Sequence, residues 1–384
     1  MIPNKDTFCV NPWLSLSLQT DNKLSPCCLI AGWNFPYQDL DKYFKSKQLN
    51  DLRKDLLNGV KNKSCHRCWY KESQGTESLR QWSNKTIKGD IRKQIENPDI
   101  EKLVNVELSL GNLCNLKCLM CKPILSSQLL AEANQHPELK PLYEKNTSYI
   151  QKHFDWPKAK EFELWCEHVL PNCTQIKFTG GEPFTIPWVP TLLKKINDDK
   201  KKQITLNIVT NLKIINHTIL ESFNHYKEVW LNISLEGIGS TFEYVRYGNN
   251  WQTVEGNINY IKDKKYKNLY LKVANIIQAT SFHSTLELVD FCDKNNMEIF
   301  PIPLENPECF HISVLTKKCK DKFLNDTANY SGKNTKYINF VRNICKENIE
   351  QDKKLAIDCM NLLDKYDKVR NTNWRDIIPL DNLQ

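Results

Sequence analysis

The chain contains no long apolar run, no apolar stretch at its beginning and no strong excess of charge of either sign. No segment approaches the roughly 18 consecutive apolar residues that cross a bilayer, so we expect no membrane-spanning helix. Residues Met1 to Asp6 lack the apolar stretch of a secretory signal, which favours a cytoplasmic location. A net charge of +8 over 384 residues is a mild bias and makes nucleic acid an unlikely partner.

Cysteine, by contrast, is abundant, with 15 in the chain. In a reducing cytoplasm, metal ligation explains so many cysteines more naturally than disulfides do. The length of 384 residues fits one barrel-sized domain of about 200 to 250 residues with appended modules. The composition therefore predicts a metal-binding protein with one large core.

Short apolar or β-branched runs alternate with helix-like stretches through the middle of the chain. The predicted strands are residues 104–110, 174–179, 204–210, 228–235, 268–277 and 299–304. The clearest helices between them are residues 189–197, 218–226, 251–262 and 284–295. Six such repeats predict an α/β fold with a parallel, curved sheet, a partial TIM-like (β/α)6 barrel. Ligands of such barrels collect at the carboxyl ends of the strands.

A cysteine-rich loop follows the first predicted strand. Cys114, Cys118 and Cys121 have the spacing CxxxCxxC. Three thiolates within eight residues can hold three corners of an iron-sulfur cube and leave the fourth iron open to a small molecule. The spacing alone also allows a zinc site that a distant cysteine completes.

Polar residues follow the next three strands. After the second strand, Gly180 and Gly181 allow a close approach of the backbone, and the carboxylate of Glu182 can accept from an ammonium group. The polar residues at the ends of the third and fourth strands are Thr210, Asn211, Ser234 and Glu236. Arg246 follows and is suited to pair with a ligand carboxylate. Polar strand ends of this kind surround one pocket.

These motifs, over about residues 100 to 305, resemble those of radical S-adenosylmethionine (SAM) enzymes. The resemblance implies that Cys114, Cys118 and Cys121 bind a 4Fe-4S cluster whose open iron is chelated by the amino and carboxylate groups of SAM. It implies reductive cleavage of SAM to a 5′-deoxyadenosyl radical that abstracts a hydrogen from the substrate. A flavodoxin-like or ferredoxin-like electron donor is the partner that such chemistry implies.

The same resemblance assigns roles to the polar strand ends. The turn Gly180, Gly181 and Glu182 would hold the methionyl amine of SAM, and Arg246 its carboxylate. The ribose-contacting positions would be Ser234 and Glu236. One departure stands out, because the family's usual glycine after Asn211 is Leu212 here.

The first hundred residues carry a second group of cysteines. Cys9 precedes a predicted β-hairpin that starts with an alternating strand at residues 14–19, and Cys27 and Cys28 end it. Cys65 and Cys68 follow with CxxC spacing. Cys9, one of Cys27 and Cys28, Cys65 and Cys68 would supply four thiolates and close a metal site. The spacing leaves open whether zinc or an iron-sulfur cluster binds there.

The arrangement of this segment resembles the SPASM module, or its shorter twitch form, of many radical SAM enzymes. Five cysteines do not suffice for two full cubes, so the resemblance favours the twitch form with one auxiliary 4Fe-4S cluster. In the family this module normally follows the barrel, whereas here it precedes it.

The expected domains are a twitch-like module at residues 1–98, a radical SAM barrel at 99–310 and a helical extension at 311–384. Within the extension, residues 337–350 and 355–366 show the clearest helical pattern. The resemblance favours a peptide or protein substrate. A small-molecule substrate such as a sugar, or a non-catalytic metal-stabilised binding protein, are the alternatives.

Overall fold

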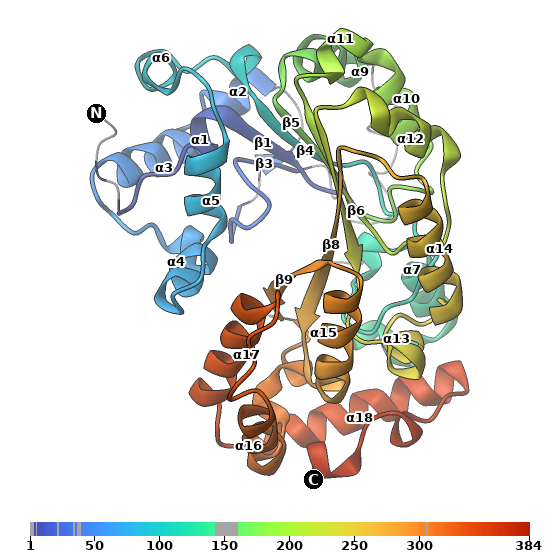
Figure 1. The fold of residues 1–384 in the computed structure, drawn as a ribbon. Coiled ribbons are helices and arrows are strands. Elements are labelled where there is room, and N and C mark those ends of the chain that lie inside the picture. The colour runs from blue at the N-terminus through green and yellow to red at the C-terminus, as the bar shows by residue number, and fades with distance from the viewer. Residues whose placement is uncertain are drawn as a thin grey trace.

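The computed structural model describes residues 4, 6–20, 23–33, 35–36, 40–142, 160–304 and 306–384. Its strands form a sheet in the order β3-β2-β1-β4-β5-β6-β7-β8-β9 (Figure 1). None of the helices in these ranges is both long and apolar enough to cross a membrane.

Six parallel strands form the centre of the sheet. They are β4 (Asn105–Ser109), β5 (Gln175–Thr179), β6 (Thr205–Thr210), β7 (Glu228–Ser234), β8 (Leu269–Ile277) and β9 (Glu298–Pro303). All six predicted strands are confirmed, each end within one residue of the expected position. Side chains alternate between the two faces of a strand, so Val106 and Leu108 are fully buried whereas Asn105 and Glu107 are only partly buried. The apolar face packs in the core, and the polar face lines the inside of the partial barrel.

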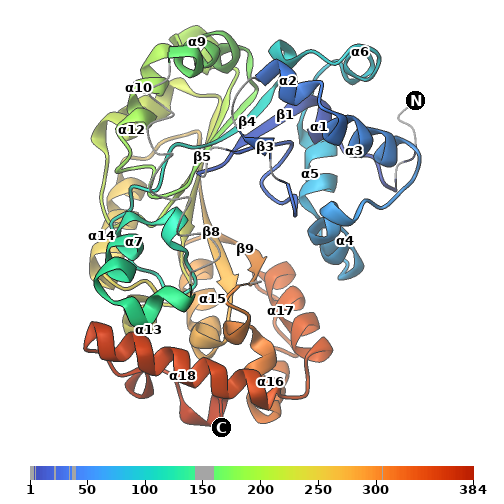
Figure 2. The same ribbon diagram turned by 180° about the vertical axis from the view of Figure 1, so that it is seen from behind.

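Helices between the strands cover the outer face of the sheet (Figures 1 and 2). The four that the sequence predicts most clearly are α10 (Trp188–Lys195), α12 (His217–Ser222), α14 (Trp251–Asp263) and α15 (Thr285–Lys294). α12 is shorter than predicted because the chain tightens into a 3-10 turn at Phe223–His225. Further helices are α7 (Ser127–Gln135), α9 (Lys160–Val169), α11 (Asp198–Lys201) and α13 (Gly239–Val245).

The N-terminal hairpin continues the same sheet. After α1 (Asn11–Leu14), β1 (Ser15–Leu18) pairs in parallel with β4, and β2 (Lys23–Ser25) pairs antiparallel with β1. β3 (Phe35–Pro36) forms the edge of the sheet. The segment expected to be a separate module therefore shares its backbone hydrogen bonds with the first barrel strand.

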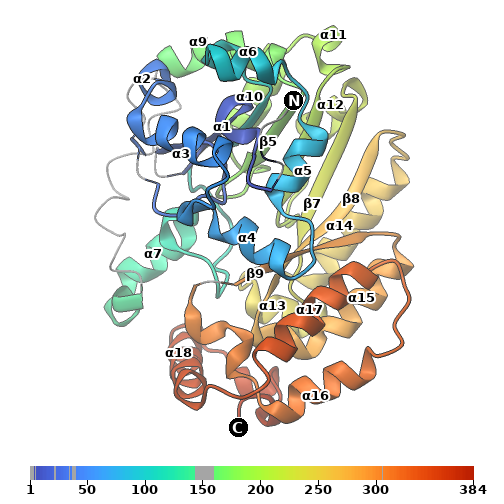
Figure 3. The ribbon, with the colours of Figure 1, turned by 90° about the vertical axis from the view of Figure 1, so that its left-hand side faces the viewer.

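The helices of the N-terminal segment are α2 (Leu40–Phe44), α3 (Lys47–Leu57), α4 (His66–Ser73), α5 (Leu79–Thr86) and α6 (Ile91–Glu96). One of them, α4, reaches the other edge of the parallel strands. From α4, the Lys71 ammonium donates to the Pro301 carbonyl of β9 at 2.9 Å and lies 4.1 Å from the centre of the Phe300 ring. Burial of Lys71 lowers its pKa to about 8. The segment thus bridges β4 and β9 and closes the partial barrel, as Figure 3 shows from that side.

The C-terminal extension is helical, as predicted, with α16 (Lys317–Asp326), α17 (Thr335–Glu347) and α18 (Lys353–Arg370). α17 meets the N-terminal segment, where the Tyr70 hydroxyl donates to the Glu347 carboxylate at 3.0 Å. α18 runs along the base of the molecule in Figure 1. Its last residue, Arg370, pairs with Glu132 of α7 at 2.8 Å, and both side chains are 2% exposed. The extension is therefore part of the core assembly.

The buried ion pair of Arg370 with Glu132 predicts how much this contact between α18 and α7 contributes to stability. Removing one partner of a buried ion pair leaves the other charge buried, so we expect Arg370→Ala to lower the free energy of unfolding by about 3–5 kcal/mol. The matched control is Arg375→Ala, because Arg375 pairs with Asp364 in solvent, with side chains 45% and 47% exposed. Arg375→Ala should lower the free energy of unfolding by less than about 1 kcal/mol. Denaturant unfolding of the three proteins measures both values, and equal losses would contradict the prediction.

Candidate active site

The cysteine loop follows β4 at the carboxyl end of the sheet and brings its three thiols together. Burial raises the pKa of Cys118, and the nearby thiols of Cys121 and Cys114 raise it further. Burial and the Cys114 thiol likewise raise the pKa of Cys121 to about 12. The three thiols therefore influence one another electrostatically, and their binding of a shared cluster stays a prediction.

Hydrogen bonds from several segments hold this loop in place. The backbone N–H groups of Lys117 and Leu119 donate to Tyr247 and Val245, each at 2.9 Å. The Ser126 hydroxyl donates to the carbonyl of Leu116 at 2.7 Å. The surrounding segments therefore support the backbone of the loop.

The two glycines after β5 pack directly on the cysteine loop. Gly180 and Gly181 have φ of +72° and +42°, which disfavour other residues. A Cβ on Gly181 would overlap the carbonyl oxygen of Leu113, and the N–H of Glu182 donates to that same oxygen at 2.8 Å. The turn thus supports the loop that carries the cysteines.

The Glu182 carboxylate, predicted to hold the methionyl amine, already has three donors within the protein. It accepts from the Thr210 hydroxyl at 2.6 Å and from the N–H groups of Asn211 and Phe184 at 2.6 and 3.0 Å. Burial raises the pKa of Glu182, and these hydrogen bonds counter that effect. Sequence reasoning did not foresee this role, in which Glu182 ties the end of β6 to the glycine turn.

Leu212, where the family's usual glycine is absent, adopts the conformation that glycine favours. Its φ is +53° and its side chain is fully buried. A left-handed conformation costs a leucine roughly 1–2 kcal/mol, and burial of its side chain contributes about 1.5–3 kcal/mol in return. Burial of the Leu212 side chain therefore offsets the cost of its left-handed backbone conformation.

Arg246 and Glu236 bind each other and lie beside the cysteine loop. The Arg246 guanidinium pairs with both oxygens of Glu236, one of them at 2.8 Å, and lies 3.7 Å from the sulfur of Cys118. Burial alone would lower the pKa of Arg246, but Glu236 outweighs it and raises that pKa. The sequence predicts both residues in the site, and the structure shows in addition that they form an ion pair. Ser234, the last residue of β7, lies two positions before Glu236.

The surroundings of the second cysteine group differ between its two adjacent members. Burial raises the pKa of Cys27, and the thiols of Cys28, Cys9, Cys68 and Cys65 raise it further. After burial, by contrast, the largest influences on Cys28 are Glu107 and Lys177, on the inner face of the barrel, and its pKa rises to about 12. Which of Cys27 and Cys28 would join the other thiols as a ligand stays a prediction.

Arg80 is a residue of this second group that the sequence did not reveal. Its guanidinium donates to the Phe8 carbonyl at 2.8 Å and pairs with Glu72. It lowers the pKa of Cys9 against the larger effect of burial. A buried cation beside four thiols would stabilise their ionised, metal-binding form. No motif marks it, because it lies in a helix outside the CxxC sequence.

In the described ranges, no three His, Cys, Asp or Glu side chains are placed to hold one metal ion. A zinc ion would bind four thiolates at about 2.3 Å from one centre, whereas each cysteine of a 4Fe-4S cube binds a different iron.

A cavity of about 440 Å³ lies inside the barrel, bounded by the inner faces of the strands, by α5 and by Cys27 and Cys28. Its polar wall comes from Asn105, Glu107, Gln175, Lys177, Thr205, Asn207 and Asn232. Its apolar wall includes Leu79, Trp82, Trp230, Phe300 and Ile302. The cavity has the size and mixed lining of a small-ligand site.

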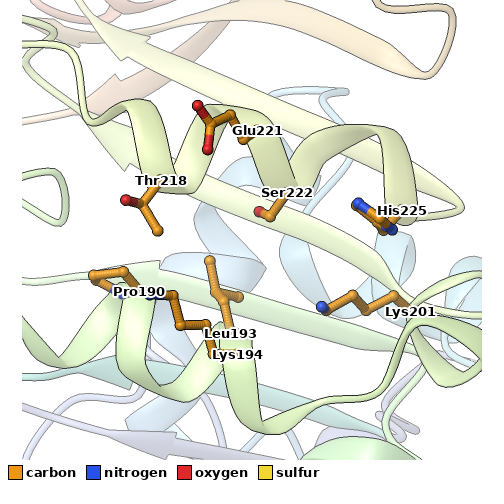
Figure 4. A pocket seen from close by; sticks show the side chains of 8 residues that line it. All are labelled: Pro190, Leu193, Lys194, Lys201, Thr218, Glu221, Ser222 and His225. Carbon is orange, nitrogen blue, oxygen red and sulfur yellow. The ribbon is translucent and has the colours of Figure 1, made fainter.

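A smaller cavity of about 200 Å³ lies on the outer layer between α10 and α12 (Figure 4). Two of its three basic neighbours, Lys201 and His225, contact Asp198, at 2.9 and 3.1 Å. It contains no cysteine and lies among the outer helices, so it is no part of the site.

Residues 108–277 match the Radical SAM superfamily model, from the end of β4 through β8. This part of the chain, somewhat less than half of it, is therefore similar to the radical SAM domain, and the similarity supports an enzymatic function.

Among solved structures, SuiB from Streptococcus suis bound to S-adenosylmethionine is similar at 13% identity, with 86% of this chain and 71% of that chain covered and a TM-score of 0.40. SuiB bound to its precursor peptide SuiA is 14% identical, with 72% and 63% covered and a TM-score of 0.38. Native anSMEcpe with bound AdoMet is 15% identical, with 58% of each chain covered and a TM-score of 0.37. No curated protein sequence matches the chain. These similarities are too low to assign a reaction.

The contact between the glycine turn and the cysteine loop predicts the effect of Gly181→Ala. The added methyl group would displace Leu113 and with it the loop, so the variant should bind roughly half the iron of the wild type after anaerobic reconstitution. Gly256→Ala, in open space on α14, is the matched control and should keep the iron content and gain up to about 1 kcal/mol in stability. Full iron loading of Gly181→Ala would refute the supporting role of the turn.

Proposed function

We propose that the chain reductively cleaves SAM at a 4Fe-4S cluster held by Cys114, Cys118 and Cys121, and uses the 5′-deoxyadenosyl radical to abstract a hydrogen from a peptide or protein. The observation that carries the proposal is the loop with three cysteines, held by hydrogen bonds to neighbouring segments and with a guanidinium 3.7 Å from the sulfur of Cys118, within the part of the chain that matches the radical SAM model. Three ligands leave one iron for the amino and carboxylate groups of SAM.

The surrounding residues orient the cofactor in this proposal. The turn at Gly180 and Gly181 packs against the cysteine loop beside which the methionyl amine would bind, while Glu182 holds the turn in register with β6. Arg246 balances the negative charge at Cys118 and, still paired with Glu236, presents its remaining N–H groups to the methionyl carboxylate. Ser234 and Glu236, which stays paired with Arg246, would contact the ribose of SAM.

The N-terminal segment, residues 1–98, is proposed as a twitch-like module with one auxiliary 4Fe-4S cluster. Its support is the grouping of Cys9, Cys27, Cys65 and Cys68, with the Arg80 guanidinium beside Cys9 and Cys68. Because the segment pairs with β4 and contacts β9, its proposed cluster lies in the wall of the barrel cavity, which Cys27 lines. A flavodoxin-like or ferredoxin-like protein would supply the electrons.

Production of 5′-deoxyadenosine tests the reaction. Anaerobically reconstituted wild-type protein, given SAM and dithionite, should form it, and the triple variant Cys114→Ala, Cys118→Ala, Cys121→Ala should not, since no site for the cluster remains. Chromatography of the quenched mixture measures the product. If fully loaded wild-type protein forms none, the proposed reaction is wrong and the non-catalytic alternative is favoured.

Iron analysis of single variants tests the second cluster. The wild type should bind about eight irons per chain, and Cys27→Ala should lose about four of them. Cys28→Ala is the matched neighbour and should keep all of them, because Cys27 is the proposed ligand and the Cys28 thiol lies beside Glu107. Zinc in place of iron, or equal losses in both variants, would contradict the assignment.

A further inference from the structure

Two neighbouring carboxamides lie on the polar wall of the barrel cavity. Asn207 of β6 and Asn232 of β7 both line it, and Nδ2 of Asn232 donates to Oδ1 of Asn207 at 2.7 Å. This bond uses the amide oxygen of Asn207 and one N–H of the Asn232 amide. Within the described residues, the amide nitrogen of Asn207 and the amide oxygen of Asn232 take part in no other hydrogen bond.

The pair therefore offers one donor and one acceptor side by side. This result does not depend on which way the amides are turned, because exchanging oxygen and nitrogen in both side chains leaves one donor and one acceptor again. Partly buried polar atoms of this kind bind water or a ligand with the complementary pattern. The complement is a group that presents C=O and N–H along one edge.

The charges around the cavity are already balanced. Lys177 pairs with Glu107 at 3.2 Å and Lys272 with Glu298 at 3.6 Å. The remaining carboxylate on the lining, Glu77, pairs with Lys85. A ligand anion or cation would have to break one of these pairs or enter without a counter-charge, so the cavity favours a neutral ligand.

Aromatic side chains adjoin the two asparagines. Trp230 of β7 is the register partner of Asn207 and meets Trp82 of α5 edge to face, with ring centres 5.8 Å apart, and Leu79 and Phe300 also line the cavity. A ligand in the cavity would place its polar edge on the asparagines and its hydrocarbon part on the aromatic rings. A primary carboxamide on a short aliphatic stem, as in a glutamine or asparagine side chain, has this form.

The position along the strands agrees with the proposed reaction. Asn207 lies three residues before Thr210, and Asn232 lies two residues before Ser234. At about 3.3 Å per residue, the pair is roughly 7–10 Å below the strand ends where SAM is proposed to bind. The aliphatic carbons of a bound side chain would then extend towards the radical.

We propose that Asn207 and Asn232 recognise a primary carboxamide, so that the substrate is a peptide bound through a glutamine or asparagine side chain in the cavity. This inference rests on the proposed function and names its substrate class. A trans peptide group has its C=O and N–H on opposite edges and fits the pair less well. A carboxylate has no donor, so one of its oxygens would face the amide oxygen of Asn232 and repel it.

Two matched probes test the site without knowledge of the natural peptide. They are N-acetylglutamine methyl ester and the α-methyl ester of N-acetylglutamate, which differ only in the terminal amide and carboxylate. Saturation-transfer NMR with cluster-loaded protein and SAM measures their binding. The amide should bind at least tenfold more tightly, because a site built to donate and accept rejects an analogue that lacks one partner.

Isosteric variants test whether binding of the amide probe depends on Asn207. Asn207→Asp removes the donor and should weaken binding of the amide probe at least tenfold, whereas Asn105→Asp should change it less than twofold. Asn105 lies on the same wall, but its amide already donates to Ser15 at 3.0 Å. If thermal melting shows that Asn207→Asp does not fold, Asn207→Ser makes the same test without a new charge.

The proposal is overturned if the amide probe shows no saturable binding, if the glutamate analogue binds equally well, or if the Asn207 variants bind like the wild type. Its failure is separate from that of the proposed function. Probe binding is measured without turnover, while formation of 5′-deoxyadenosine reports the radical chemistry with no substrate present.

Discussion

The parallel backbone ladder from β1 through β9 is the constraint on which the rest of this structure depends. Parallel strands end at one edge, so loops from β4, β5, β6 and β7 meet there, although up to about 130 residues separate them. Hydrogen bonds between those loops then hold the three thiols of the cysteine loop together. The addition of β1 beside β4 extends the same ladder and brings the second group of cysteines to the cavity wall.

Buried positive charge is the second recurring feature. Arg246 lies at the sulfur of Cys118, and Arg80 lies beside Cys9 and Cys68. Each arginine is itself paired with a glutamate, which keeps it ionised and oriented. Thiols in apolar surroundings resist ionisation, so a fixed guanidinium at each group lowers the cost of the thiolates that a cluster needs. The two cysteine groups differ in their number of thiols, yet they share this electrostatic arrangement.

Much of the core was predictable because its signals are local. Apolar runs of strand length located β4 to β9, and the cysteine spacing located the loop after β4. The partners of Glu182 and Arg246 were not predictable, since hydrogen bonds to Thr210 and to Glu236 depend on how strand ends are placed in space. The different surroundings of Cys27 and Cys28 were equally hidden, because the contacts of two adjacent residues depend on segments far away in the sequence.

The amino-acid sequence by itself determined the strand and helix order, the three-cysteine loop and the class of chemistry that an open iron corner supports, because these follow from residue type and short-range spacing. Only the tertiary structure decided that the N-terminal hairpin joins the barrel sheet, that the N-terminal helices close the gap to β9, and that Asn207 and Asn232 face one neutral cavity. Those contacts join residues far apart in the chain. Their geometry is set by strand register and packing, which no local pattern encodes.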